Sequence, residues 1–313
     1  MPILSTMRFL VLGGTRFVGR AVVDAALADG HEVTLFNRGR TAPDLYPSLE
    51  TVVGDRTSDL SALAGRRFDT VIDCAGYHPP VVEISVAALR DAVDRYVFVS
   101  TVSVYADQSV PPVEGALVLG DDSYGGRKAT CERIVLSAFG SRALAARPGL
   151  IVGPHDPTER FSYWSRRLAR GGTVLAPGSP DDPVQFVDVR DLGRFLVAPE
   201  PSGVYNVVGT PLPFGELLSV CRTVTGSTAS LVWVPTADLR AAGIEDMGVP
   251  LWIGDPDWKA ANLVDGSRAR AAGFTTRPVA ETVADVLAWD IARGGPADEP
   301  FSAEEEQQLL AGR

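Results

Sequence analysis

A tyrosine and a lysine four residues apart, Tyr124 and Lys128, are the side chains of this sequence best suited to move a proton. Residues at this spacing share one face of a helix, so both could act on one substrate. A free phenol has a pKa of ~10, and a neighbouring ammonium would lower that pKa toward the range useful for acid–base catalysis. Taken alone, the spacing also fits an ordinary exposed helix.

Hydroxyl groups follow the apolar run at residues 96–100, in the stretch Ser100-Thr-Val-Ser-Val-Tyr105. If the run is a strand, Thr101 and Ser103 lie at the carboxyl edge of a sheet. A hydroxyl there could hydrogen-bond a substrate oxygen while the tyrosine transfers its proton. Serine and threonine are also common turn residues, which is the alternative interpretation.

A third feature is an apolar run at residues 8–12 that stops at Gly13-Gly14 and continues through Thr15-Arg16-Phe17-Val18-Gly19 as a helical pattern. The unpaired N–H groups and positive dipole end of a helix after such a turn bind anions, and glycine lets a pyrophosphate approach closely. The usual Gly-x-Gly-x-x-Gly spacing is absent, because Arg16 stands where a middle glycine is expected. A simple strand-to-helix turn is the alternative.

Strand and helix patterns alternate through the first half of the chain. Strands are predicted at 9–12, 33–36, 51–53, 70–74, 96–100 and 144–147, and helices at 17–27, 79–93 and 122–139. This rhythm predicts an α/β fold, with a Rossmann-type doubly wound parallel sheet that binds ligands at the carboxyl ends of its strands.

The later part of the chain breaks this alternation and predicts a smaller, mixed α/β substrate lobe. We assign residues 1–158 plus about 184–208 to the sheet domain, and about 159–183 plus 209–293 to the second lobe. Residues 294–313 are expected to form a peripheral helix capped by Ser302, with acidic residues in its first turn where the helix dipole favours them.

Composition limits the function classes. The 313 residues are 45% apolar, without a membrane-length apolar run, and Met1 to Thr6 lack signal-peptide features, so a cytoplasmic protein is expected. A net charge of −10 argues against a general nucleic-acid surface. The cysteines and histidines are too scattered for a disulfide framework or a metal site, so no metal is expected.

Together, Gly13-Gly-Thr-Arg-Phe-Val-Gly19, the Ser-Thr-x-Ser-Val-Tyr stretch, Tyr124-x-x-x-Lys128 and Arg147-Pro-x-x-x-x-Gly-Pro154 resemble the extended short-chain dehydrogenase/reductase superfamily, commonly labelled NAD-dependent epimerase/dehydratase. The resemblance covers roughly residues 8–290. In pattern the chain is most similar to an atypical branch that includes the chloroplast stem-loop-binding proteins and many bacterial reductases.

The resemblance implies roles for individual residues. Thr101 matches the catalytic hydroxyl, Tyr124 the acid/base, and Lys128 the residue that holds the nicotinamide ribose, while Ser103 matches a position that often touches substrate. The matching cofactor positions are Gly13, Gly14, Thr15, Arg16, Phe17, Val18, Gly19, Asn37, Arg38, Asp55, Cys74, Ala75 and Lys128. Family members often dimerise through the helices predicted here at 80–93 and 122–139, so a homodimer is expected.

One departure from the family pattern bears on the cofactor. NAD-preferring relatives end the second strand with an acid, whereas this chain has Asn37 followed by Arg38. Arg38 and Arg16 could pair with a 2′-phosphate that a carboxylate would repel. We therefore expect NADP(H), with NAD(H) as the alternative and two surface arginines as the simplest explanation.

Other departures bear on the substrate. Val102-Ser103 replaces the Asp-Glu pair of sugar-nucleotide dehydratases, so dehydration is rejected. Val184 replaces an arginine that binds the sugar-nucleotide diphosphate, which disfavours nucleotide sugars unless Arg190 or the group Arg160, Arg166 and Arg167 substitutes. Trp164 is expected to line a pocket for an apolar or cyclic substrate, although core packing would also explain its type.

The sequence therefore favours a reductase acting on a small-molecule carbonyl or secondary alcohol by a Thr-Tyr-Lys mechanism. A redox-neutral epimerase with a retained cofactor is the second hypothesis, because it would use the same side chains. A superfamily member that binds RNA or a protein without catalysis is the third. Thr101, Tyr124 and Lys128, together with the negative net charge, argue against it.

Overall fold

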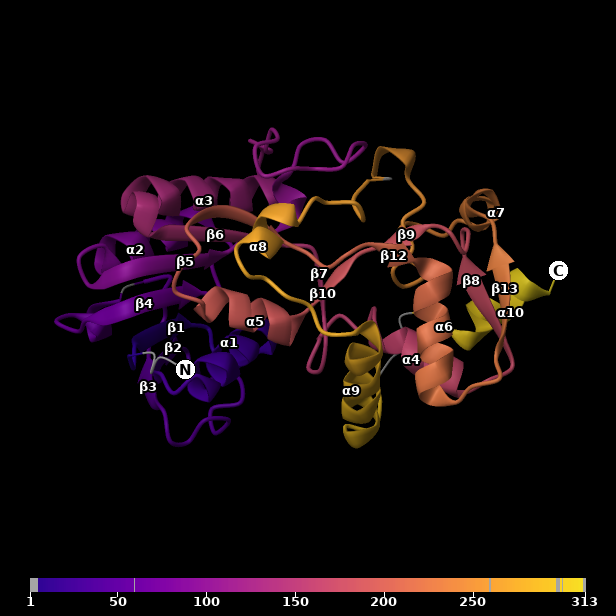
Figure 1. Cartoon of the computed structure of the whole chain (residues 1–313), viewed down its shortest axis with the longest axis horizontal. Coiled ribbons are helices and arrows are strands. Elements are labelled where there is room, and N and C mark those ends of the chain that lie inside the picture. Colours follow the sequence, from indigo (N-terminus) through magenta and orange to yellow (C-terminus); the bar gives the residue numbers. More distant parts are fainter. Residues whose placement is uncertain (1–4, 59, 259, 297–298, 300, 312–313) are drawn as a thin grey trace.

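The computed structural model describes residues 5–58, 60–258, 260–296, 299 and 301–311. These residues form two lobes side by side along the long axis of the molecule, with the N-terminus on the first lobe and the C-terminus at the far end of the second (Figure 1). Within the described residues no helix is long and apolar enough to cross a membrane.

Seven strands, all paired in parallel, form the sheet of the first lobe in the order β11-β6-β5-β4-β1-β2-β3. Their bounds are β1 Arg8–Leu12, β2 Glu32–Asn37, β3 Glu50–Val53, β4 Phe68–Asp73, β5 Val93–Val99, β6 Ala143–Pro148 and β11 Gly203–Val207. The strand order reverses between β1 and β4, and ligands of such sheets bind at the carboxyl ends beside that reversal. The predicted Rossmann-type sheet is confirmed.

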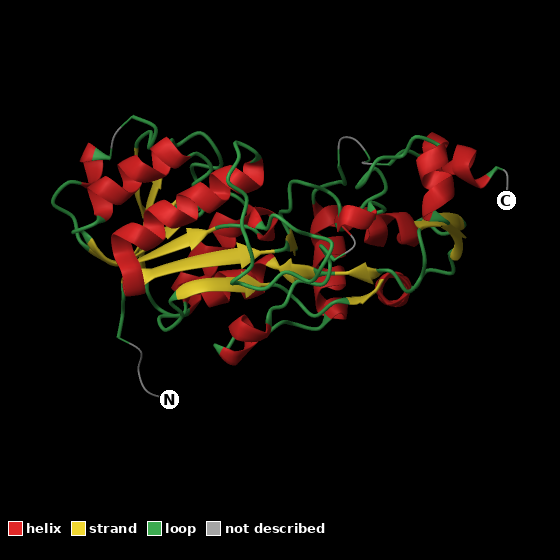
Figure 2. Cartoon of the chain, turned by 90° about the horizontal axis from the view of Figure 1, so that it is seen from above, coloured by secondary structure: helices red, strands yellow, loops and turns green. Residues whose placement is uncertain are grey.

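Helices cover both faces of the sheet, as Figure 2 shows. Phe9 and Val11 of β1 pack in one core with α1 and α5, whereas Leu10 and Leu12 pack in another with α2 and α3. Side chains alternate along a strand, so a continuous apolar run supplies both cores. The four helices are α1 Phe17–Ala28, α2 Pro79–Leu89, α3 Tyr124–Phe139 and α5 Val189–Val197.

The second lobe has a core of its own, built mainly from three helices and a two-stranded parallel sheet. The helices are α4 Ser162–Ala169, α6 Phe214–Thr225 and α9 Val279–Ala292, and the strands are β8 Thr173–Pro177 and β13 Ser230–Val234. A shorter helix, α7 Thr236–Ala241, follows β13. These helices and strands therefore pack around a core that is separate from those of the first lobe.

Short strands connect the lobes: β7 Leu150–Val152 pairs with β10 Phe186–Asp188, and β9 Pro183–Val184 with β12 Leu212–Pro213. Single 3₁₀ turns lie at η1 Ser61–Leu63, η2 Val102–Val104, η3 Gly140–Arg142 and η4 Pro256–Trp258. The stretch with α8 (Ser267–Ala271) and Phe274 returns to the core of the first lobe, although the sequence assigned it to the second. The remaining domain bounds stay a prediction.

The C-terminal helix α10 spans Ala303–Leu310 and begins with the expected cap. The Ser302 hydroxyl accepts from the Glu305 N–H, and the Glu305 carboxylate accepts from the Ser302 N–H. The helix is not a loosely attached surface element, because the buried Glu306 carboxylate accepts from the Leu175 N–H and from Arg167. Residues 297, 298, 300, 312 and 313 of the predicted peripheral region lie outside the described residues.

A buried ion pair fixes α3 to the sheet. Arg147 of β6 donates from Nε and Nη2 to the two carboxylate oxygens of Glu132, over 2.9 and 2.6 Å. The side chains are only 5% and 3% exposed. Arg147 also donates to the Tyr105 hydroxyl, which donates to Asn206 of β11. This network connects α3, the loop after β5 and the sheet edge.

Removing one partner of this pair should destabilise the protein more than removing a surface pair. For Arg147→Leu we expect a loss of about 3–5 kcal/mol in the free energy of unfolding, because Glu132 is left buried and unpaired. The double variant Glu132→Gln/Arg147→Leu should recover part of that loss. Urea unfolding measures both, with Arg66→Ala as a surface control expected to cost less than about 1 kcal/mol. An equal cost for Arg147→Leu and Arg66→Ala would contradict the buried pair's structural role.

Candidate functional site

A pocket of about 730 Å³ lies at the carboxyl ends of β1, β2, β4 and β5. Most predicted site residues line it. They are Gly13, Thr15, Arg16, Phe17, Val18, Gly19, Asn37, Arg38, Asp55, Cys74, Ala75, Tyr124 and Lys128. The structure therefore brings the two ends of the predicted site, separated by about a hundred residues of sequence, into one cavity.

The glycine turn forms one wall of this pocket. Gly13 has φ of +107°, which a residue with a side chain rarely adopts, and a Cβ at Gly19 would lie 3.0 Å from the Gly13 carbonyl oxygen. Gly14 plays a different role, because it packs beneath the turn where a Cβ would lie 2.6 Å from the Leu35 side chain. Helix α1 follows without a side-chain cap or an acidic residue in its first turn. Its N-terminus thus keeps the character of an anion site.

Three arginines border the end of the pocket near β2: Arg16, Arg38 and Arg40. Their guanidinium groups make no hydrogen bond or salt bridge with another side chain among the described residues. The exposed carboxylate of Asp55 lies near them, and its pKa is lowered by hydrogen bonds from Thr57 and by the charges of Arg38 and Arg40. An unpaired cationic group of this kind is suited to a phosphate.

Asn37 stabilises the turn that follows β2. Its side-chain oxygen accepts from the Gly39 N–H over 2.7 Å, and its carbonyl accepts from the Gly54 N–H over 3.0 Å. The amide therefore shapes the turn that carries Arg38 and Arg40. Without a carboxylate at this position, nothing in the side chain repels a phosphate.

The hydroxyl residues after β5 meet the first turn of α3. Thr101 Oγ1 accepts from the Ser103 N–H and lies 3.1 Å from the Ser103 hydroxyl. A Cβ at Gly125 would lie 2.0 Å from the Ser103 carbonyl oxygen, so only a glycine lets the helix approach this closely. Gly125 thus lets the first turn of α3 bring the Tyr124 phenol beside Thr101. Neither Thr101 nor Ser103 is among the residues that line the pocket.

Tyr124 is 46% exposed and lies on the pocket wall. Burial and the neighbouring Tyr77 raise its pKa, and a hydrogen bond with Thr101 opposes this effect. In the protein without ligands the pKa of this phenol is therefore raised, and the lowering expected from an ammonium together with a bound nicotinamide ring stays a prediction. The phenol is a proton donor at neutral pH in this state.

Lys128 is 3% exposed, and its ammonium is held at the carboxyl ends of two strands. Nζ donates to the Gly76 carbonyl over 2.8 Å and to the Val99 carbonyl over 2.6 Å. It also lies 4.3 Å from the centre of the Phe98 ring. Burial lowers the pKa of Lys128 to about 8, against the attraction of nearby groups led by Asp73.

Trp164 does not lie at this pocket. It is 1% exposed in the core of the second lobe, where its indole N–H donates to the Pro250 carbonyl over 2.9 Å. Its contacts with Tyr163 and Phe214 fill that core. The prediction that Trp164 contacts substrate is corrected accordingly, since aromatic residues of a second lobe are needed first for packing.

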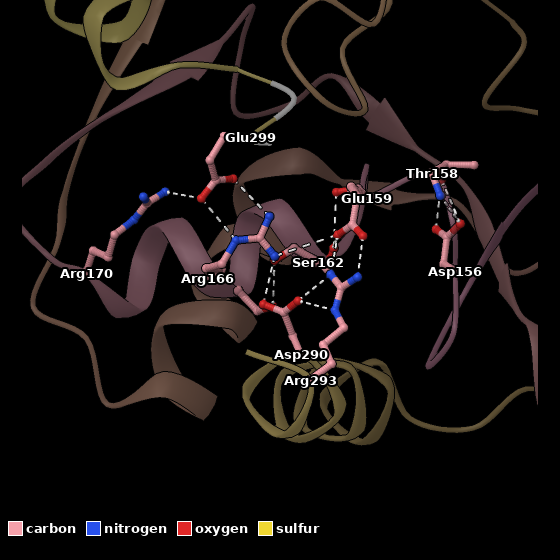
Figure 3. A network of polar contacts seen from close by, with 10 residues as sticks. Asp156, Thr158, Glu159, Ser162, Arg166, Arg170, Asp290, Arg293 and Glu299 are labelled. Atoms are coloured by element: carbon pink, nitrogen blue, oxygen red, sulfur yellow. Dashed lines mark hydrogen bonds and ion pairs between the residues drawn. The ribbon is translucent and has the colours of Figure 1, made fainter. Parts of the chain in front are cut away.

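The arginines considered for a nucleotide-sugar diphosphate are mostly paired within the protein. Figure 3 shows Arg166 between Asp290 and Glu299, with Arg293 joining Asp290 to Glu159. Arg167 pairs with Glu306, and Arg190 with Asp188 and Asp285. These pairs connect the loop before α4 to α9 and α10, so their charges are neutralised locally. Arg160 lies near Asp156 and makes no such pair among the described residues.

Several pocket residues were not identified from the sequence. Arg40, Arg56, Tyr77, His78 and Ser100 line the cavity, and the Ser100 hydroxyl is buried without a hydrogen-bond partner among the described residues. Arg40 could have been identified as a site residue from its position after the second strand. Ser100 could have been identified from its position at the end of the fifth strand. Nothing in the local pattern around Tyr77 marks it as a site residue.

A family model described as "NAD dependent epimerase/dehydratase family" matches residues 9–207. Among curated proteins, the chain is 31% identical to 2'-dehydrokanamycin reductase of Streptomyces kanamyceticus over 97% of this chain and 90% of that protein. It is 29% identical to 2-alkyl-3-oxoalkanoate reductase of Stenotrophomonas maltophilia, over 71% of this chain and 76% of that protein. For the chloroplast stem-loop binding protein of 41 kDa b of Arabidopsis thaliana the values are 28%, 69% and 59%, so the match spans little more than half of that protein.

Solved structures share the fold. UDP-N-acetylglucosamine 4-epimerase from Bacillus cereus superposes with a TM-score of 0.70 at 19% identity, over 95% of this chain and 100% of that one. The Bordetella bronchiseptica enzyme WbmG in complex with NAD gives 0.69 at 21% identity, over 97% of this chain and 99% of that one. At such low identity these similarities establish the architecture and not the substrate.

The raised pKa of Tyr124 can be tested without any ligand. Since burial raises the pKa of Tyr124 above the value of about 10 that a free phenol has, its phenolate should form only above pH 10. The difference in phenolate absorbance between the wild type and Tyr124→Phe measures this ionisation during an alkaline titration. In Thr101→Val the ionisation should move to still higher pH, because a hydrogen bond that lowers the pKa is lost. A Tyr124 phenolate that forms well below pH 10 would refute this assignment.

Proposed function

The chain belongs to the NAD dependent epimerase/dehydratase family, and we propose that it is an NADP(H)-dependent oxidoreductase. It is an extended short-chain dehydrogenase/reductase enzyme that uses NAD(P). Its proposed reaction is hydride transfer at a carbonyl or secondary alcohol of a small or cyclic molecule. The observation that carries the cofactor choice is the group Arg16, Arg38 and Arg40, which have no carboxylate partner within salt-bridge distance among the described residues.

The residues present fit a dinucleotide. The glycine turn leaves space that a side chain would fill, and the uncapped N-terminus of α1 can receive a pyrophosphate. Arg16, Arg38 and Arg40 would hold a 2′-phosphate at the β2 end of the pocket. Asp55 would remain available to the adenine, and Cys74 and Ala75 would border the middle of the cofactor.

At the other end of the pocket, side chains of α3 and β5 would perform the proton transfer. Thr101 and Tyr124 would hydrogen-bond the substrate oxygen, and Tyr124 would deliver its proton to that oxygen during reduction. Ser103 would contact the substrate or orient Thr101, with which it already interacts. Lys128 would hold the nicotinamide ribose. When bound, the nicotinamide supplies the hydride.

The protonation of the free protein favours reduction over oxidation. The phenol of Tyr124 is neutral and Lys128 is charged at neutral pH, since the pKa of the first is raised and that of the second is about 8. A carbonyl being reduced needs a proton donor, which Tyr124 then is. Two of the similar proteins are named as reductases, one of 2-alkyl-3-oxoalkanoate and one of 2'-dehydrokanamycin, which supports this direction.

The two other hypotheses differ in what accompanies the purified protein. An epimerase would retain its dinucleotide through purification, whereas a reductase would exchange it. A nucleic-acid-binding member would bind neither dinucleotide. The observation that supports this hypothesis is the similarity to the chloroplast stem-loop binding protein.

The expected homodimer would form through α2 and α3, which pack side by side on one face of the sheet.

Thermal shift and fluorescence titration should show that NADPH binds more tightly than NADH. Arg38→Ala should weaken NADPH by roughly 10- to 100-fold, since one charge-assisted contact to a phosphate is lost, and change NADH less than about threefold. Arg67→Ala, an exposed arginine outside the pocket, is the matched control. Equal losses for the two cofactors would rule out the phosphate role, and failure to bind either would end the oxidoreductase proposal.

Replacing Tyr124 by Phe should remove turnover while preserving cofactor binding. We expect NADPH oxidation against a panel of cyclic and short-chain ketones to fall by roughly 10²–10⁴-fold, the usual contribution of a positioned acid. NADPH affinity should stay within about threefold, because the ring is kept. Full activity of Tyr124→Phe against any panel member that the wild type reduces would exclude the assigned proton donor.

A further inference from the structure

A buried carboxylate and guanidinium without a role in the proposed reaction lie directly beneath the pocket. Asp73 ends β4 and is fully buried, and Arg56 lines the pocket. Arg56 donates to the Asp73 oxygens over 2.5 and 2.8 Å and to the Ser85 hydroxyl over 2.8 Å. The Tyr96 hydroxyl donates to Asp73 over 2.9 Å. Burying such a pair gains little net stability, so its placement invites a functional explanation.

Asp73 also shapes the backbone that holds the Lys128 ammonium. Its Oδ1 accepts from the Ala75 N–H over 3.0 Å and so fixes the turn after β4. A Cβ at Gly76 would lie 3.0 Å from Asp73 Oδ2, which places the carboxylate against this turn. The Gly76 carbonyl in turn accepts from Lys128 Nζ over 2.8 Å. The carboxylate and the ammonium thus both contact one short loop.

The surroundings of Lys128 contain few compensating charges. Its own helix presents Cys131 and Glu132, and Glu132 is already bound by two nitrogens of Arg147. Asp73 comes from β4 and the aromatic ring of Phe98 from β5, and Cys74 and Tyr77 lie on the loop after β4. Arg56 holds Asp73 ionised, because the charge and hydrogen bonds of Arg56 lower the pKa of this carboxyl against the effect of burial.

The sequence uses lysine very sparingly. Only two of its 29 basic residues are lysines, Lys128 and Lys259. Arginine stays charged in proteins, whereas the charge of a buried lysine depends on its neighbours. A lysine at the centre of the site therefore needs a partner that keeps it charged.

We propose that Asp73 is a positioning residue for Lys128. Its carboxylate, held by Arg56 and Tyr96, fixes the loop that accepts from the ammonium and provides the negative charge that keeps the ammonium protonated at neutral pH. The binding consequence rests on the proposed function, because only a dinucleotide enzyme needs Lys128 to hold a ribose. The charge relationship itself can be tested without any cofactor.

Lysine labelled with ¹³C at Cε gives two signals in this protein, and Lys259→Arg identifies the one from Lys128. A pH titration of the wild type should give a midpoint near the Lys128 pKa of about 8. Asp73→Asn should lower the midpoint by roughly one unit, because the carboxylate charge near the ammonium is lost, and Arg56→Met should lower it as well, because Arg56 holds Asp73 ionised. Ser85→Ala removes a hydrogen-bond acceptor of Arg56 without removing a charge, and it should leave the midpoint unchanged. A purely structural role would shift the midpoint in Ser85→Ala too.

Two further variants keep this test decisive. Asp73→Asn/Arg56→Met removes the pair together and should fold even if Asp73→Asn does not; its midpoint should lie below that of the wild type. Asp69→Asn/Arg8→Met removes an exposed pair that includes the other aspartate of β4 and should leave the midpoint unchanged. Unchanged midpoints in both Asp73 variants, or a shift in Ser85→Ala as large as that in Asp73→Asn, would overturn the proposal.

NADPH titrations over the same pH range connect the charge to binding. In the wild type, NADPH affinity should fall above the Lys128 midpoint, and in Asp73→Asn/Arg56→Met this fall should begin roughly one unit lower. If the wild type binds no dinucleotide, the proposed function fails while the lysine titration still decides the role of Asp73. If the wild type binds NADPH and the fall does not move, the role of Asp73 in binding is rejected.

Discussion

The hydrogen bonds from Lys128 to the carbonyl groups of Gly76 and Val99 are the contacts on which the site depends. They join the first turns of α3 to the ends of β4 and β5, so the position of Tyr124 is set relative to the sheet and not only to its own helix. The approach requires Gly125, since a side chain there would collide with the Ser103 carbonyl. A glycine usually weakens a helix, and here Gly125 allows the close approach of α3 to the loop after β5.

Burial also separates the arginines that are paired with carboxylates of the protein from those that are not. Arg147, Arg56 and Arg166 are largely enclosed, and each is paired with carboxylates that hold segments distant in sequence together. Arg16, Arg38 and Arg40 lie at the pocket without such partners among the described residues. An enclosed cation needs a counter-ion within the protein, whereas a cation at an open cavity can be neutralised by a bound ligand. The distinction separates arginines that stabilise the fold from the three at the pocket for which we propose a phosphate.

Much of the first lobe could be predicted because its signals are local. The apolar run ending at Gly13 and the Tyr124-x-x-x-Lys128 spacing each lie within one element and its turn, and the structure places them as expected. The return of Phe274 to the first core and the burial of Trp164 depend on contacts across the chain. Periodicity reports that a side chain is apolar without reporting which core receives it. The pairing of Asp73 with Arg56 could not be predicted either, because it too depends on a contact between separate segments of the chain.

The pKa values of Tyr124 and Lys128 show why motif chemistry needs an environment. Side by side in water, an ammonium would lower the pKa of a phenol, and that was the expectation from sequence. In the fold, burial acts on both groups and in opposite directions, raising the pKa of the phenol and lowering that of the ammonium. Both shifts favour the less charged form of each group. The free protein is thereby prepared to donate a proton, and oxidation in the reverse direction would require an added positive charge near the phenol.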